Sequence, residues 1–168
     1  MQARWIPMAL RKSCRHTYTA TRYDKISLPF NRFMPLLKTY LVEDSPLIRE
    51  SLIAMLEDLA QVEVVGTAED ESAAVQWLTN PENHADLVIV DIFLKVGSGL
   101  GVLRNARAAT TNSKTVVLTN YATDDMKLKC LELGADQVFD KSNDIDALIS
   151  YCSRMNEGEK ITTRPALL

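Results

Sequence analysis

Residues 87–99 read LVIVDIFLKVGSG, an aliphatic run that ends in an aspartate and continues into a glycine-rich loop. Four aliphatic residues in a row, from Leu87 to Val90, are typical of a strand that is covered by helices on both faces of a parallel sheet. A lone carboxylate buried directly after such a strand would be strongly unfavourable without a partner. We therefore expect Asp91 to have a specific chemical role.

Strands and amphipathic helices alternate along the chain on both sides of this stretch. The expected strands cover residues 36–42, 62–65, 86–92, 114–118 and 137–140, and Gly66 is expected to close the second. The first expected helix begins at Pro46, and its apolar face includes Leu47, Leu52, Leu56 and Leu59. The other expected helices cover residues 70–78, 100–109, 124–133 and 144–154. Such alternation predicts βαβ units, and hence an α/β fold with one parallel sheet and helices on both faces.

Basic residues are concentrated at the N-terminus. Residues 1–33 hold seven Lys and Arg but one acid, whereas the other 135 residues hold 12 bases and 21 acids. We interpret 1–33 as a disordered, dispensable extension or an artefact of an upstream start codon, with a transit peptide as the alternative. Residues 34–156 are the expected domain and 157–168 a tail. The acidic domain argues against nucleic-acid binding, and no apolar run is long enough to cross a membrane.

Polar residues follow four of the expected strands. Ligands of open α/β sheets bind beyond the carboxyl ends of the strands, where these residues would meet. They are Glu43 and Asp44, Asp91, Thr119, and Asp140 followed by Lys141. Two carboxylates at ~4 Å repel by about 4 kcal/mol at an effective dielectric of about 20, so such a cluster needs a cation or a raised carboxyl pKa. Oxygen donors without nearby Cys or His favour Mg²⁺ or Mn²⁺.

Lys141 and Thr119 add the charge and the hydrogen-bond donor that a phosphoryl group requires, which makes Asp91 a candidate phosphoryl acceptor. Each residue also has an ordinary explanation: Glu43 and Asp44 as helix-capping acids, Thr119 as a turn residue and Lys141 as solvated surface. The agreement of four strand ends on one chemistry favours the site.

Residues 36–156 resemble the receiver domain of bacterial response regulators, the phosphoacceptor half of two-component signalling. The matching motifs are LVEDS (41–45), LVIVDIFLKVGSG (87–99), VVLTN (116–120) and GADQVFDKS (134–142). The resemblance implies a flavodoxin-like (βα)5 fold with strand order 2-1-3-4-5. It also implies that a histidine kinase or histidine phosphotransfer protein phosphorylates Asp91. In the implied site, Asp44, Asp91 and the Phe93 backbone carbonyl ligate Mg²⁺, Glu43 assists through water, and Lys141 and Thr119 contact the phosphoryl group.

The family signals through the face formed by its fourth helix, fifth strand and fifth helix. The resemblance therefore implies a switch rather than an enzyme, and it also implies a location in the cytoplasm. Because about a dozen residues follow the last helix, we expect a stand-alone receiver or phosphorelay intermediate with an unidentified protein target. The alternatives are a receiver that binds partners without phosphorylation, a fragment of a larger regulator, and a Mg²⁺-dependent phosphatase. The phosphatase would need a second aspartate where Phe93 stands.

Several positions depart from the family pattern. Val138 stands in place of the usual Tyr or Phe of the switch, and the adjacent Phe139 should face the opposite side of the strand. Ser142 and Lys95 each replace a common proline.

Asn120 stands where the family prefers a small residue. We hypothesise that the bulk of Asn120 and Tyr121, together with Phe93, slows the attack of water on the phosphorylated aspartate and prolongs that state.

Overall fold

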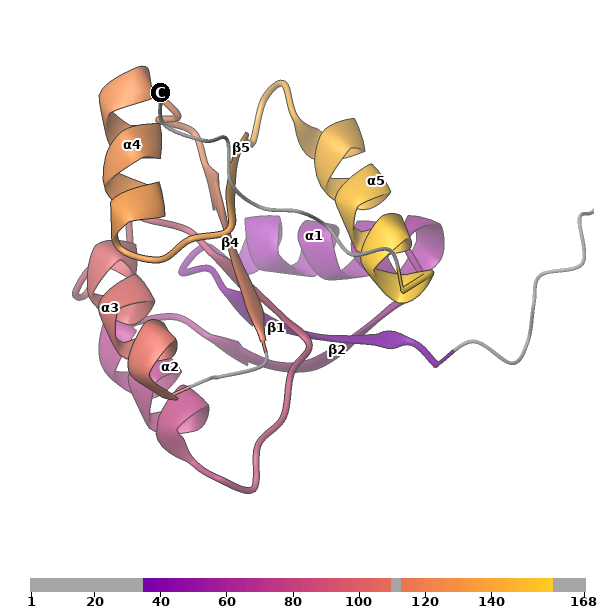
Figure 1. Ribbon diagram of the computed structural model, residues 1–168, viewed down its shortest axis with the longest axis horizontal. Coiled ribbons are helices and arrows are strands. Elements are labelled where there is room, and N and C mark those ends of the chain that lie inside the picture. Colours follow the sequence, from indigo (N-terminus) through magenta and orange to yellow (C-terminus); the bar gives the residue numbers. More distant parts are fainter. Residues whose placement is uncertain (1–34, 110–112, 159–168) are drawn as a thin grey trace, which may run out of the picture. The chain divides into compact units, whose positions relative to one another are not determined.

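The computed structural model describes residues 35–109 and 113–158, which form a parallel sheet covered by helices on both faces (Figure 1). The strands are β1 Leu37–Val42, β2 Val62–Ala68, β3 Leu87–Val90, β4 Lys114–Thr119 and β5 Gln137–Asp140. The helices are α1 Pro46–Leu59, α2 Glu71–Thr79, α3 Gly99–Ala109, α4 Asp124–Glu132 and α5 Ile145–Asn156. All strand pairs are parallel, in the order β2-β1-β3-β4-β5, which confirms the predicted fold and strand order. The segment 1–33 and residues 159–168 of the predicted tail lie outside the described residues.

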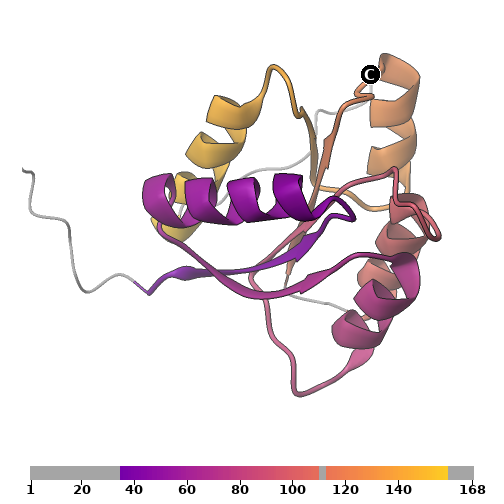
Figure 2. The same cartoon turned by 180° about the vertical axis from the view of Figure 1, so that it is seen from behind.

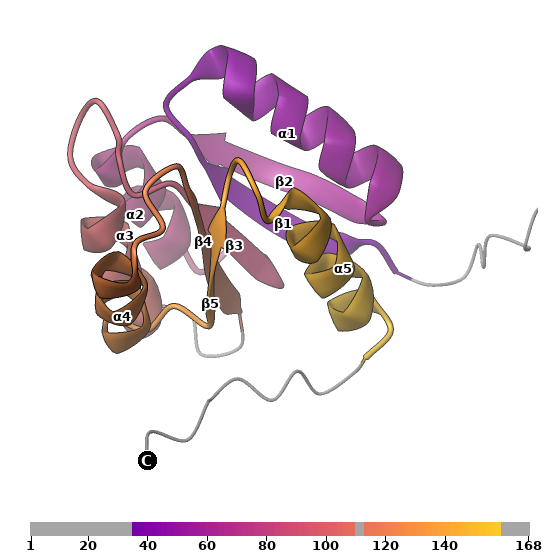
Figure 3. The same ribbon diagram turned by 90° about the horizontal axis from the view of Figure 1, so that it is seen from above.

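Different helices cover the two faces of the sheet. Figure 3 shows α1 and α5 on one side of the strands and α2, α3 and α4 on the other, and Figure 2 shows the same grouping from behind. In β3, Leu87 and Ile89 pack with α1 and α5, whereas Val88 and Val90 pack with α2, α3 and α4. All four side chains are fully buried, and each contributes about 1.5–3 kcal/mol to folding. The double covering explains why the strand is aliphatic at every position.

Helix starts follow local signals in the sequence. Pro46 is the first residue of α1, where its missing N–H leaves no helical hydrogen bond unmade. The Asp70 carboxylate accepts a hydrogen bond from the Ala73 N–H (2.8 Å) and caps α2. Thr123 caps α4 in the same way through Met126. Each cap satisfies one of the amide groups that a helix leaves unpaired at its N-terminus.

The second strand is longer than predicted. We expected Gly66 to end β2, but the strand continues to Ala68, and its pairing with β1 shifts register between Thr39 and Tyr40. Tyr40 and Trp77 stack with ring centroids 3.9 Å apart, and a Cβ at Gly66 would lie 2.9 Å from the Trp77 indole nitrogen. Gly66 therefore marks the close approach of this aromatic pair to the strand rather than its end.

The buried face of α1 is narrower than predicted. Leu52 and Leu56 are buried against the sheet, but Leu47 is 75% exposed and Leu59 is also exposed. Five residues of helix turn Leu47 roughly 140° away from Leu52, which takes it off the buried face. Leu59 is the last residue of the helix.

Among the described residues, no helix combines the length and the apolar character needed to span a membrane.

Candidate functional site

The predicted site residues lie at the carboxyl edge of the sheet, where backbone hydrogen bonds hold them just beyond the strands. The Asp91 N–H donates to the Val42 carbonyl (2.9 Å), so the acceptor candidate sits beside the end of β1. The Glu43 N–H donates to the Ala68 carbonyl (3.0 Å), and the Lys141 N–H donates to the Thr119 carbonyl (3.0 Å). The ladder of the sheet thus fixes where the backbone presents these side chains.

Three carboxylates gather at this edge. Glu43, Asp44 and Asp91 each offer one oxygen, and these oxygens lie within 4.8 Å of one another. Glu43 is 1% exposed and Asp91 8%, so water screens their charges poorly. The donors are hard oxygens alone, which is the set that Mg²⁺ and Mn²⁺ prefer. These residues therefore fit the predicted divalent cation.

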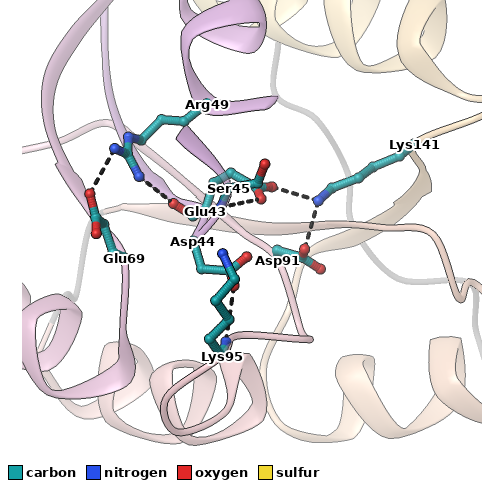
Figure 4. Close-up of polar contacts among 8 residues, drawn as sticks. All are labelled: Glu43, Asp44, Ser45, Arg49, Glu69, Asp91, Lys95 and Lys141. Carbon is teal, nitrogen blue, oxygen red and sulfur yellow. Dashed lines mark hydrogen bonds and ion pairs between the residues drawn. The ribbon is translucent and has the colours of Figure 1, made fainter. Parts of the chain in front are cut away.

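Lys141 lies between two of the carboxylates. Its ammonium nitrogen is 2.5 Å from Glu43 Oε2 and 2.6 Å from Asp91 Oδ2 (Figure 4). Burial alone would lower the pKa of Lys141, but the hydrogen bonds and charges of Asp91 and Glu43 outweigh it and raise the pKa. The ammonium therefore stays charged through the neutral range and balances the two most buried acids.

The other carboxylate oxygens accept hydrogen bonds from backbone amides. The Ser45 N–H donates to Glu43 Oε1 (3.1 Å), and the Phe93 N–H donates to Asp91 Oδ1 (3.3 Å). Asp44 Oδ2 accepts from the Lys95 N–H at 3.1 Å. These bonds fix the orientation of all three carboxylates in the cluster.

Thr119 ends β4 at the same edge, and its side chain is fully buried. Its hydroxyl oxygen accepts a hydrogen bond from the Tyr121 N–H at 3.3 Å. The Tyr121 ring meets the exposed Phe93 ring edge to face, with centroids 5.9 Å apart. The loops after β3 and β4 are therefore in contact above the strand ends.

The loop after β3 is packed tightly against its surroundings. A Cβ at Gly99 would lie only 2.0 Å from the Asp91 carbonyl oxygen, so a side chain at this position would push the Asp91 backbone out of place. The Glu71 carboxylate at the start of α2 accepts a hydrogen bond from the Ser98 N–H at 2.9 Å. Side chains at Gly97 and Gly101 would collide with Glu71.

Two residues that support the site were missed at the sequence level. Arg49 of α1 donates to the Glu43 carbonyl and pairs with Glu69, both at 2.8 Å, and thereby ties β1, α1 and the end of β2 together. Glu71 anchors the loop that follows Asp91. Arg49 follows Glu43 by six residues, but this spacing alone does not distinguish an arginine that bonds to the Glu43 carbonyl from one that is solvated at the surface.

The two residues of β5 at the predicted switch position face opposite sides, as expected. Val138 packs in the core beneath α2, α3 and α4. Phe139 packs on the other face, where its ring lies 5.7 Å from that of Tyr151 in α5. Phe139 therefore does not take the place of the Tyr or Phe that the family usually has at the position of Val138.

The family model of the response regulator receiver domain matches residues 39–153. The chain belongs to this family. Receiver domains generally bind Mg²⁺ at an acidic pocket, and the carboxylates of Glu43, Asp44 and Asp91 form such a cluster in this one.

The receiver domain has relatives among curated response regulators. Response regulator UvrY of Escherichia coli K12 is 26% identical over 125 residues, which cover 74% of this chain and 56% of the relative. The nitrate/nitrite response regulator protein homolog of Haemophilus influenzae is 29% identical over 127 residues, covering 74% and 59%. The chain therefore spans a little more than half the length of these relatives.

Solved structures share the fold of this receiver. A two-component response regulator of the LuxR family from Aurantimonas sp. SI85-9A1 superposes with a TM-score of 0.66 at 25% identity, covering 73% of this chain and 86% of that one. The receiver domain of the putative response regulator NarL from Mycobacterium tuberculosis gives a TM-score of 0.64 at 20% identity, covering 73% and 98%. The second likeness supports the architecture alone.

Proposed function

We propose that this receiver is a phosphoacceptor switch in which Asp91 takes a phosphoryl group from the phosphohistidine of a histidine kinase or histidine phosphotransfer protein. The observation that carries the proposal is the position of Asp91: a nearly buried carboxylate within a cluster of three acids, paired at 2.6 Å with Lys141. A structural role alone does not require three acids to share one buried edge, because their mutual repulsion destabilises the fold.

Mg²⁺, with Mn²⁺ as a substitute, would be held by Asp44, Asp91 and the Phe93 backbone carbonyl, with Glu43 assisting through water. A bound divalent cation would neutralise charge on the acids and on the phosphoryl oxygens. The Phe93 N–H bond to Asp91 places the Phe93 backbone beside the acceptor, which agrees with this ligand set.

The transfer needs no further reactant. An Asp91 carboxylate oxygen attacks phosphorus and a P–O bond forms, while the P–N bond breaks with its electron pair leaving on nitrogen; the proton on the other ring nitrogen of the phosphohistidine lets the imidazole leave in its neutral form. Lys141 already lies at the reacting carboxylate, and its ammonium can turn to a phosphoryl oxygen. The Thr119 hydroxyl, at the end of the neighbouring strand, would bind another phosphoryl oxygen.

The output would be a shift in population between two conformations rather than turnover of a substrate. We assign the output surface to α4, β5 and α5, where Leu128 and Leu131 of α4 are exposed and available to a protein partner. Because Val138 replaces the aromatic switch residue, we expect the shift to reach this surface through Thr119 and the β4–α4 loop. Such a switch would act in the cytoplasm on a protein target, without direct contact to nucleic acid.

Phosphorylation can be tested by intact mass. The protein is incubated with Mg²⁺ and a small phosphodonor such as acetyl phosphate, and we expect one added phosphoryl group that is absent in Asp91→Asn. Asp86→Asn is the matched control, because Asp86 is an exposed aspartate that precedes β3 at the opposite edge of the sheet. No adduct with any donor would favour a receiver that binds partners without phosphorylation. Continuous phosphate release over many turnovers would favour a Mg²⁺-dependent phosphatase.

A further inference from the structure

Lys95 lies beside the acidic cluster at a position that the family usually gives to proline. Its backbone N–H is 3.1 Å from Asp44 Oδ2, and its ammonium nitrogen is 3.5 Å from the same oxygen. Figure 4 shows the side chain running alongside Asp44, on the side of the cluster away from Lys141. Both the main chain and the side chain of Lys95 therefore converge on one carboxylate oxygen of the cluster.

The two lysines at the site divide the three acids between them. Lys141 pairs with Glu43 and Asp91, and Lys95 pairs with the remaining acid, Asp44. The two lysines differ in burial, because the Lys95 side chain is 73% exposed and that of Lys141 only 8%. Lys95 can therefore leave its carboxylate for water, where an ammonium is well solvated, whereas Lys141 cannot.

We propose that Lys95 is a resident counter-ion that competes with the divalent cation for Asp44 and thereby weakens cation binding by the unphosphorylated receiver. The inference rests on the proposed function, since it concerns the same cation. Cation binding at Asp44 would displace the ammonium to solvent, and the backbone bond from the Lys95 N–H could persist because Glu71 and Gly99 hold this loop in place. The competition therefore requires a side-chain movement and no change in the fold.

The expected effect is moderate. Exposed ion pairs are weak because water and salt screen them, so Lys95 opposes the cation without excluding it. Replacing Lys95 with glutamine should tighten Mg²⁺ binding roughly three- to tenfold at low ionic strength. The gain should shrink when salt is added, because the ammonium acts through its charge.

Isothermal titration of the metal-free protein with Mg²⁺ tests this directly. Lys95→Gln and Lys95→Met should both bind more tightly than the wild type, while Lys95→Arg, which keeps the charge, should stay close to it. Lys38→Gln is the matched control: it removes the same charge from an exposed lysine near the start of β1, at the opposite edge of the sheet, and should leave the affinity within about twofold. Circular dichroism in EDTA checks that each variant is folded.

The outcomes separate the inference from the proposed function. Mg²⁺ binding that is lost in Asp44→Asn but unchanged or weakened in Lys95→Gln and Lys95→Met would overturn the role of Lys95 and leave the cation site standing. A gain in Lys95→Arg equal to that in Lys95→Gln would also overturn it, because the charge would then be irrelevant. Absence of Mg²⁺ binding in the wild type, or binding indifferent to Asp44→Asn, would instead remove the proposed cation site and the inference with it.

Discussion

Replacement of Lys141 by methionine perturbs the charge balance of the site most directly. The Lys141 ammonium lies 2.5 Å from Glu43 Oε2 and 2.6 Å from Asp91 Oδ2, and all three side chains are nearly buried. Those two oxygens are therefore at most about 5 Å apart, a distance at which unpaired carboxylates repel by about 3 kcal/mol at an effective dielectric of about 20. Removal of a single partner also leaves buried charge uncompensated, so the total loss in the free energy of unfolding should be about 3–5 kcal/mol.

The pH dependence of this loss has a definite sign. A lysine whose pKa is raised by folding contributes its full stabilisation below its ordinary value of 10.5 and loses it only as the pH rises through the raised value. Wild type should therefore keep the Lys141 contribution throughout the neutral range. In Lys141→Met, Mg²⁺ should restore stability at neutral pH, because a bound cation would neutralise charge on the acids.

Urea unfolding followed by far-ultraviolet circular dichroism measures these effects, in EDTA and in Mg²⁺, at neutral pH. Lys38→Met serves as the control for loss of a lysine charge far from the site. The double variant Lys141→Met with Glu43→Gln should recover much of the loss, because one of the two repelling charges is gone. A loss below about 1 kcal/mol, or one that Mg²⁺ does not change, would refute the charge-balance explanation.

Four other outcomes are expected. Gly99→Ala should lower the free energy of unfolding by more than about 2 kcal/mol in urea, because its Cβ would meet the Asp91 carbonyl at 2.0 Å; a neutral result would contradict the close approach. Tyr151→Phe should be neutral or stabilising by up to about 1 kcal/mol, because the buried Tyr151 hydroxyl has no hydrogen-bond partner among the described residues; a clear loss would count against this. Burial raises the pKa of Cys152 to about 12, so iodoacetamide should alkylate it only on unfolding, as peptide mass mapping can verify. Asn120→Ala should shorten the lifetime of the phosphorylated protein, which is measured by the release of phosphate. An unchanged lifetime would reject a shielding role.

The strand ends of this site could be predicted because sheet geometry leaves little choice. Once the aliphatic run before Asp91 is taken as a doubly covered strand, parallel pairing brings Asp91 to the same edge as Glu43 and Lys141. The alternation of side chains in β5 likewise fixed the opposite faces of Val138 and Phe139. These predictions succeeded because each depends on a short, regular repeat.

Features that depend on packing between distant segments could not be predicted in the same way. Gly66 resembled a strand terminator, yet it makes room for the stack of Tyr40 and Trp77, which come from two other elements. Arg49 and Glu71 gain their roles from carbonyl and amide groups that only the folded chain brings near. Local sequence patterns contain no information about such partners.

Two of the residues that depart from the family pattern, Lys95 and Asn120, have locations that explain why the fold tolerates them. Lys95 and Asn120 lie on loops beyond β3 and β4, whereas Asp91 and Lys141 follow directly on strands whose hydrogen bonds extend to them. A change at a strand end disturbs the buried charge balance, but the exposed Lys95 side chain can change with little effect on the core. Under the proposed function, cation affinity and the lifetime of the phosphorylated state would therefore vary through these loops, while the acceptor chemistry proposed for Asp91 would stay the same.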